Sequence, residues 1–131
     1  MTKIILEAGL SLSKRAGGMK YSLNFGKKEA KIIGTKHLQY RVEDREGPDT
    51  LFALKPVTDA RHSPKIHVMQ RKDPGQYHME FPTSLSSKAQ VGVEGKSCRV
   101  EVWLYNDGTI YVRRPTAAAI KKALDDNSKQ Q

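Results

Sequence analysis

The chain has 131 residues, of which 37% are hydrophobic and 28% charged, and it carries a net charge of +9. This length fits one domain, and no apolar run approaches the roughly 20 residues that a membrane-spanning helix needs. The single Cys98 excludes an internal disulfide, which favours a reducing, cytoplasmic compartment.

The first half of the chain shows the alternation of apolar and polar residues that is typical of β-strands. Tyr21, Leu23 and Phe25 alternate with Ser22 and Asn24, so one face of this strand should be buried. Glycine-rich and proline-containing stretches punctuate the pattern. The expected elements are strands at 3–13, 21–25, 38–42 and 51–54, a tight turn at 16–18 and a short helical turn at 27–33.

The second half follows the same plan after a proline-flanked linker at 57–64. Asn106-Asp107-Gly108 is the strongest hairpin signal in the chain, because the turn requires positive φ. Thr116 can cap a terminal helix that packs through Ile120 and Leu124. The expected elements are strands at 66–69, 77–81, 99–105 and 109–113, a helical turn at 83–90 and the terminal helix at 116–126.

The two halves also match each other in sequence. Residues 10–25 align without a gap with 66–81, and after a small slip 41–43 matches 99–101 and 50–52 matches 109–111. The paired positions include Leu10 with Ile66, Leu12 with Val68, Arg15 with Arg71, Tyr21 with Tyr77, Leu23 with Met79 and Phe25 with Phe81. A repeat of this length indicates units that cannot bury their apolar faces alone.

The repeat predicts one mainly β domain over 1–131, a pseudo-symmetric barrel of two ββαβ-like units with a carboxy-terminal helix. The first unit is expected at about 3–56 and the second at about 65–115. Phe25 and Phe81 should be buried at equivalent positions.

The turn and strand pattern of the second unit resembles the cradle-loop barrels, which include AbrB-type swapped-hairpin transcription factors and double-psi β-barrels. The features that carry the resemblance are Arg71-Lys72-Asp73-Pro74-Gly75, Phe81-Pro82, the short helix through Leu85, Gly95-Lys96, Arg99–Val102, Asp107–Ile110 and Arg114-Pro115. The resemblance implies either a dimer that binds DNA through basic loop residues or a self-contained barrel with other roles. Two copies in one chain favour the self-contained barrel, and the sequence leaves monomer and homodimer open.

Basic residues are concentrated between Lys14 and Lys36, where Glu29 is the only acidic residue, and an acidic loop follows at 41–49. Loops and short helices protrude from a barrel, so basic side chains there can reach phosphates. We therefore predict a nucleic-acid-binding surface. Its residues are Lys14, Arg15, Lys20, Lys27, Lys28, Lys31, Arg71 and Lys72.

No motif announces a reaction, a metal or a cofactor. Glu94-Gly95-Lys96-Ser97 resembles the end of a phosphate-binding loop, but Gln90 stands where that motif requires glycine. The four histidines lack metal-ligand spacing and are interpreted as surface residues. We expect no catalytic residue, although groups that meet only in space escape this reasoning.

Trp103 and Tyr105 share one face of the strand at 99–105, opposite Val102 and Leu104. With both faces apolar, either the terminal helix covers the Trp103 face or a partner protein binds there.

The sequence as a whole favours a nucleic-acid-binding protein, specifically a DNA-binding transcriptional regulator. The alternative is a protein-binding adaptor or inhibitor, for example of a nucleic-acid enzyme, acting through its basic face.

Overall fold

The computed structural model describes residues 2–34, 39–45, 47–58, 65–72 and 75–129. Strands dominate it, as predicted. Their bounds are β1 Lys3–Arg15, β2 Gly18–Phe25, β3 Gln39–Glu43, β4 Thr50–Pro56, β5 Ile66–Val68, β6 Gln70–Lys72, β7 Gln76–Pro82, β8 Cys98–Tyr105 and β9 Ile110–Arg113. The helical elements are α1 Lys27–Ile33, a 3₁₀ turn η1 Thr83–Leu85, and α2 Ala117–Lys129.

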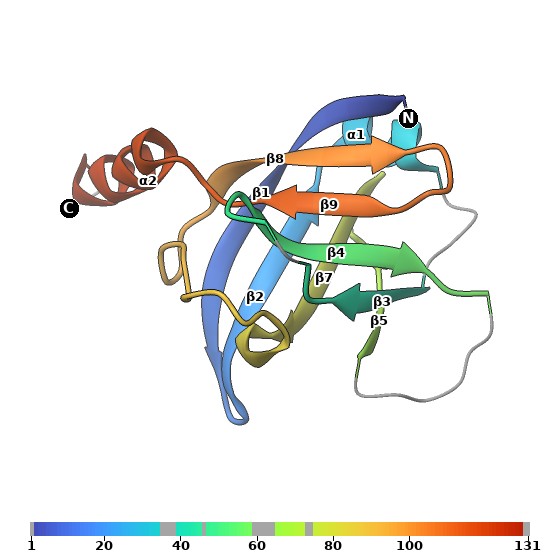
Figure 1. Ribbon diagram of the computed structural model, residues 1–131. Coiled ribbons are helices and arrows are strands. Elements are labelled where there is room, and N and C mark those ends of the chain that lie inside the picture. Colours follow the sequence, from blue (N-terminus) through green and yellow to red (C-terminus); the bar gives the residue numbers. More distant parts are fainter. Residues whose placement is uncertain (1, 35–38, 46, 59–64, 73–74, 130–131) are drawn as a thin grey trace.

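The strands form one antiparallel sheet in the order β5-β3-β4-β9-β8-β1-β2-β7-β6. The two edge strands, β5 and β6, are separated in sequence by Met69 alone. The extended segment 66–72 therefore joins both edges, and the sheet curls into a nearly closed barrel (Figure 1). The predicted mainly β barrel with a carboxy-terminal helix is confirmed.

The ladder order is unchanged when the two halves of the chain are exchanged. Each half runs strand, strand, helical turn, strand, strand, if β5 and β6 are taken as one bent strand. The β2–β7 ladder pairs Leu23 with Met79, and on either side Tyr21 with Phe81 and Phe25 with Tyr77. Exchanging the two halves according to the sequence alignment therefore leaves the residue pairs of this ladder unchanged. The β4–β9 ladder likewise joins a strand of the first half to its counterpart in the second half.

The core fills the barrel with the inward side chains of these strands. Phe25 and Phe81 are both buried, at 1% exposure, as predicted. The rings of Phe52 and Phe81 meet edge-on with centroids 4.6 Å apart, and Tyr21 lies 5.8 Å from Phe52 and 5.9 Å from Phe81. Aromatic residues from both halves therefore form the centre of the core.

The tight turns follow the sequence signals closely. The β1–β2 hairpin pairs Arg15 with Gly18, whose φ of +112° suits glycine. At the β8–β9 turn, the Asp107 carboxylate accepts a hydrogen bond from the Thr109 amide at 2.9 Å, and Gly108 has φ of +88°. The predicted Asn-Asp-Gly hairpin is confirmed.

Two local predictions are wrong. The alignment matches Val68 with buried Leu12, but Val68 is 50% exposed and Met69 is buried at 4%. The His67 ring lies 5.9 Å from that of Phe81, so residues 67 and 69 face the core and the alignment is off by one residue in this strand. The helical turn expected at 83–90 is only the short η1. The following segment is fixed by Ser86, whose Oγ donates a hydrogen bond to the Leu51 carbonyl at 2.8 Å.

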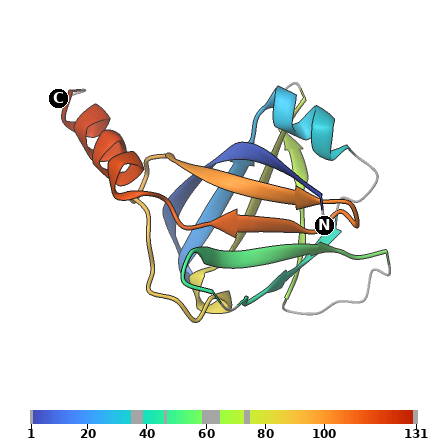
Figure 2. The same cartoon turned by 45° about the horizontal axis from the view of Figure 1, so that its top comes forward.

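The terminal helix begins as expected and packs differently. Thr116 Oγ1 accepts a hydrogen bond from the Ala119 amide at 3.1 Å, which is the predicted cap. The helix continues to Lys129, beyond its expected end at residue 126. Ala123 is the buried contact at 6% exposure, whereas Leu124 is 51% exposed, because α2 extends away from the barrel (Figure 2). Packing through Leu124 is therefore wrong.

Within the described residues, no helix is both long and apolar enough to cross a membrane. The expected linker at 57–64 falls largely outside the described residues; β4 runs to Pro56, and the Val57 amide donates to the Gln39 carbonyl at 3.0 Å.

Candidate nucleic-acid interface

The structure divides the eight predicted basic residues into two groups. We call Lys27, Lys28, Lys31, Arg71 and Lys72 the α1 group, and Lys14, Arg15 and Lys20 the hairpin group. Lys20 is half-buried and the other seven are exposed. The β1–β2 hairpin tip and α1 lie at opposite ends of β2 (Figure 1). At about 3.4 Å per residue, the six steps from Lys20 to Gly26 separate the groups by about 20 Å.

The α1 group joins residues that are far apart in sequence. Ala30 anchors the short helix against the barrel at 5% exposure, which leaves the three lysines in solvent. The β6–β7 register pairs Lys72 with Gln76, and the β2–β7 register places Phe25 beside Tyr77. These pairings bring Arg71 and Lys72 to the end of the sheet where α1 starts.

Lys27 shows how close the two parts of the α1 group lie. A methyl group built on Gly75 would lie 3.3 Å from Lys27 Cγ, so the lysine stem passes close to Gly75, just before β7. Among the residues that the structure describes, no carboxylate forms an ion pair with any member of the α1 group. Five cations that form no ion pair within the described part of the chain are suited to a polyanion.

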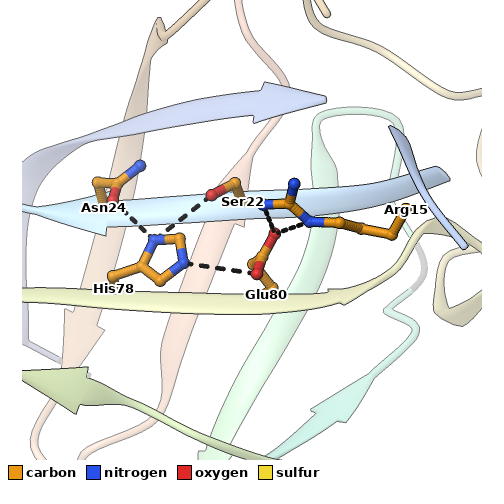
Figure 3. Close-up of polar contacts among 5 residues, drawn as sticks. All are labelled: Arg15, Ser22, Asn24, His78 and Glu80. Atoms are coloured by element: carbon orange, nitrogen blue, oxygen red, sulfur yellow. Dashed lines mark hydrogen bonds and ion pairs between the residues drawn. The ribbon is translucent and has the colours of Figure 1, made fainter. Parts of the chain in front are cut away.

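A polar cluster occupies the outer face of β2 and β7 between the two groups (Figure 3). The Arg15 guanidinium donates two hydrogen bonds to Glu80 Oε1, at 3.0 and 2.7 Å. His78 Nδ1 lies 2.8 Å from Asn24 Oδ1 and 3.4 Å from Ser22 Oγ. His78 Nε2 lies 3.8 Å from Glu80 Oε2. The cluster thus links the hairpin group to the centre of the sheet.

The cluster keeps His78 neutral and Glu80 charged. Burial lowers the pKa of His78, and the positive charges of Lys72 and Arg15 add to this effect against the opposing charge of Glu80. For Glu80, burial acts to raise the pKa, but the hydrogen bond and charge of Arg15 outweigh it, so the pKa is lowered.

This geometry does not activate Ser22 as a nucleophile. The Asn24 amide oxygen can only accept, so His78 Nδ1 is the donor between them and has no free lone pair for the Ser22 proton. The cluster is a hydrogen-bonded surface, and the Arg15–Glu80 pair within it is half exposed on the arginine side, at 52%. Exposed pairs of this kind contribute little stability, about 0–1 kcal/mol, so Arg15 can exchange Glu80 for a phosphate at small cost.

In the acidic loop at 41–49, three acidic residues have basic partners within the chain, and the fourth, Glu46, lies outside the described residues. Arg45 pairs with Glu43 at 2.6 Å, Lys88 with Asp44 at 3.7 Å and Arg113 with Asp49 at 3.6 Å. Lys88 also donates to the Arg45 carbonyl, and hydrogen bonds from Ser87 lower the pKa of Asp44. The basic residues that hold this loop are not the ones predicted to bind nucleic acid.

A groove of about 700 Å³ lies between α2 and the outer face of β1 and β8. Its charged lining is mixed, with Glu7, Glu29 and Glu101 beside Arg99 and Lys122. Arg99 Nε lies 3.2 Å from Glu7 Oε2. Among the described residues, no group of three or more histidine, cysteine or acidic side chains could hold a metal ion. The mixed charge makes this groove less suited to a polyanion than the α1 group.

Val102 points inward and is fully buried, so Trp103 and Tyr105 face outward as the sequence indicated. Trp103 is half-buried, because Lys3 and Arg113 lie against its ring.

The sequence does not predict the cluster around His78, because its spacing indicates only a surface histidine. Its side chain is only 15% exposed. His67 is also half-buried, with its ring centroid 5.9 Å from that of Phe81, and His37 and His62 lie outside the described residues. The signal was the outward alternation of Ser22 and Asn24 on one strand and His78 and Glu80 on another, which has meaning only once the β2–β7 register is known.

No protein-family model matches the chain, and no curated protein or solved structure is significantly similar to it.

Proposed function

We propose that the protein binds nucleic acid, with DNA as the expected ligand and transcriptional regulation as the expected role. The observation that carries the proposal is the α1 group, in which five exposed cations from two separate parts of the chain meet at one end of the barrel without acidic partners among the described residues. Such a surface binds phosphates through charge and releases condensed counterions when it does so.

The sheet face next to the α1 group supports the same proposal. The β1–β2 register places Ser11 beside Ser22 and Ser13 beside Lys20 on the outer face. The serines are small and polar, so they leave room for a backbone lying along β1 and β2, and the cluster of His78 and Glu80 borders this path on β7. The separation of about 20 Å between the groups allows one duplex or one extended strand to contact both.

The finer assignment to an AbrB-type or double-psi cradle-loop barrel is part of this proposal. It is supported by the exchange symmetry of the ladders and by the basic residues on the first short helix. In AbrB-type proteins DNA is bound through basic residues of the first loop and short helix, and the matching positions here are Lys14, Arg15 and the lysines of α1.

The experiment is a salt titration of binding with a charge-matched control. In one variant Lys27, Lys28 and Lys31 are replaced by glutamine. In the control the exposed Lys55, Lys121 and Lys122, which lie outside both basic groups, are replaced in the same way. Fluorescence anisotropy of a labelled duplex then gives the slope of log K against log salt concentration.

We expect the α1 variant to bind more weakly and its slope to flatten by up to about 2.7, which is 0.9 for each of three phosphate contacts. The control should keep the wild-type slope, because it changes net charge equally without touching the interface. Equal effects in both variants would show that only net charge matters. An unchanged slope in the α1 variant would favour the adaptor or inhibitor, whose basic face meets an acidic protein surface.

A further inference from the structure

A second surface with binding chemistry lies on the outer face of β8, β9 and β1. The ladder registers set Tyr111, Trp103 and Ile5 side by side across the three strands. Tyr105 lies next to Lys3 in the neighbouring row, and its ring meets that of Tyr111 at 5.0 Å. Ile5 is 56% exposed, so the row is an apolar and aromatic strip open to solvent at the β1 side.

Two cations from different strands lie against the indole. Lys3 Nζ is 3.2 Å from the Trp103 ring centroid, and the Arg113 guanidinium carbon is 3.9 Å from it. The indole itself is oriented by a hydrogen bond from its Nε1 to Glu101 Oε1 at 2.5 Å. Arg113 is held in turn by Thr50 Oγ1 at 2.5 Å. The ring is thus fixed in orientation, and Arg113 is braced from the β4 side.

Lys3 is the movable part of this arrangement. It is the first residue of β1, and no carboxylate among the described residues forms an ion pair with it. A planar group that stacked on the indole could displace the ammonium at little cost. The displaced ammonium would then lie beside the group to which the planar ring is covalently bonded.

We propose that this strip is a stacking site for the bases of single-stranded nucleic acid, with Trp103 as the main platform, Lys3 as the phosphate contact and Arg113, which stays paired with Asp49, as a cation–π contact. Bases stack on aromatic rings irrespective of sequence, and arginine adds a cation–π contribution. Duplex DNA keeps its bases stacked within the helix, so it cannot use the site. The inference rests on the proposed function, because the α1 group lies at the same end of the barrel as Lys3 (Figure 1) and can hold the backbone of the same strand.

Trp103 is the only tryptophan in the chain, so its emission reports the site directly. The experiment titrates the wild-type protein with oligothymidine, oligouridine and a blunt duplex of equal length, recording tryptophan emission together with the anisotropy of labelled strands. We expect saturable quenching by the single strands and none by the duplex. Trp103→Leu should weaken single-strand binding about tenfold, within the range for one stacked base, and leave duplex binding within about twofold.

Tyr105→Leu provides a second variant if Trp103→Leu does not fold, as judged by its circular dichroism spectrum, and a smaller loss of single-strand affinity is expected for it. The two proposals fail in different ways. Anisotropy that shows binding, without a change in Trp103 emission or a loss of affinity in the variants, would overturn the stacking site and leave the α1 group as the interface. Equal quenching by duplex would also overturn it. No binding of any of the three ligands would overturn the proposed function as well.

Discussion

The sequence alignment makes Phe25 and Phe81 equivalent, yet the structure predicts that they differ in their contribution to stability. Both side chains are 1% exposed, so each should lose a comparable transfer free energy when it is truncated. The Phe81 ring also meets those of Phe52 and Tyr21, whereas Phe25 forms no ring pair among the described residues. It lines a small void beside Ala30 at the α1 end of the core.

The magnitudes follow from these surroundings. Replacing either phenylalanine with alanine should cost about 3–5 kcal/mol. Aromatic pairs contribute about 0.5–1.5 kcal/mol beyond the area they bury, and the 4.6 Å edge-on contact between Phe52 and Phe81 is the closest in the cluster. We therefore expect Phe81→Ala to cost about 1 kcal/mol more than Phe25→Ala.

The measurement is urea unfolding followed by far-ultraviolet circular dichroism, with a double-mutant cycle of Phe52→Leu and Phe81→Leu to isolate the ring contact. Leucine keeps most of the apolar volume, so the coupling term reports the aromatic geometry. A coupling near zero, or equal losses for the Phe25 and Phe81 variants, would refute the idea that the core is energetically uneven beneath its symmetric topology.

Gly108→Ala should destabilise the protein by about 1–2 kcal/mol, because the φ of Gly108 is +88°. Gly17→Ala adds a methyl group in open space and should change the unfolding free energy by less than about 0.5 kcal/mol. Chemical denaturation of both variants measures the difference. Lowering the pH through the ordinary His78 pKa of 6.5 should reduce stability, because the folded-state pKa is lowered and the unfolded chain takes up the proton first. A His78→Gln variant should lose less stability than the wild type between about pH 7 and pH 5.5, and an equal loss would contradict the assignment.

The fold could be predicted from the sequence wherever local chemistry decides it. Alternation placed β2, β7 and β8, and the Asn-Asp-Gly turn placed the β8–β9 hairpin, because period-two burial and positive φ are written into neighbouring residues. The exposure of Val68 was not predictable in this way. It depends on how the segment 66–72 divides its pairing between β3 and β7, at opposite edges of the sheet.

The candidate site shows the same limit. Seven of the eight basic residues are exposed as predicted, although only the three lysines of α1 lie in a short helix and the other five lie in strands. The division into two groups follows from the antiparallel direction of β2. The link between Arg15 and Glu80 spans the register of two strands from different halves of the chain. Trp103 is contacted by Arg113 from one neighbouring strand and by Lys3 from the other. Neither contact can be predicted from the spacing of these residues in the sequence.

The pairing of charges, and not their number alone, decides where this protein presents its positive potential. Glu43, Asp44 and Asp49, the acidic residues of the 41–49 loop that the structure describes, each have a basic partner within the chain, so their charges are largely compensated. Exposed surface pairs are weak, about 0–1 kcal/mol, but the opposite charges of each pair still cancel at distances larger than their separation. The net charge of +9 is therefore concentrated where cations outnumber carboxylates, as in the α1 group, whose five cations have Glu29 of α1 as a neighbour but form no ion pair with any described carboxylate. Under the proposed function, this end of the barrel is where we expect a phosphate backbone to bind first, and the strip around Trp103 begins at the same end.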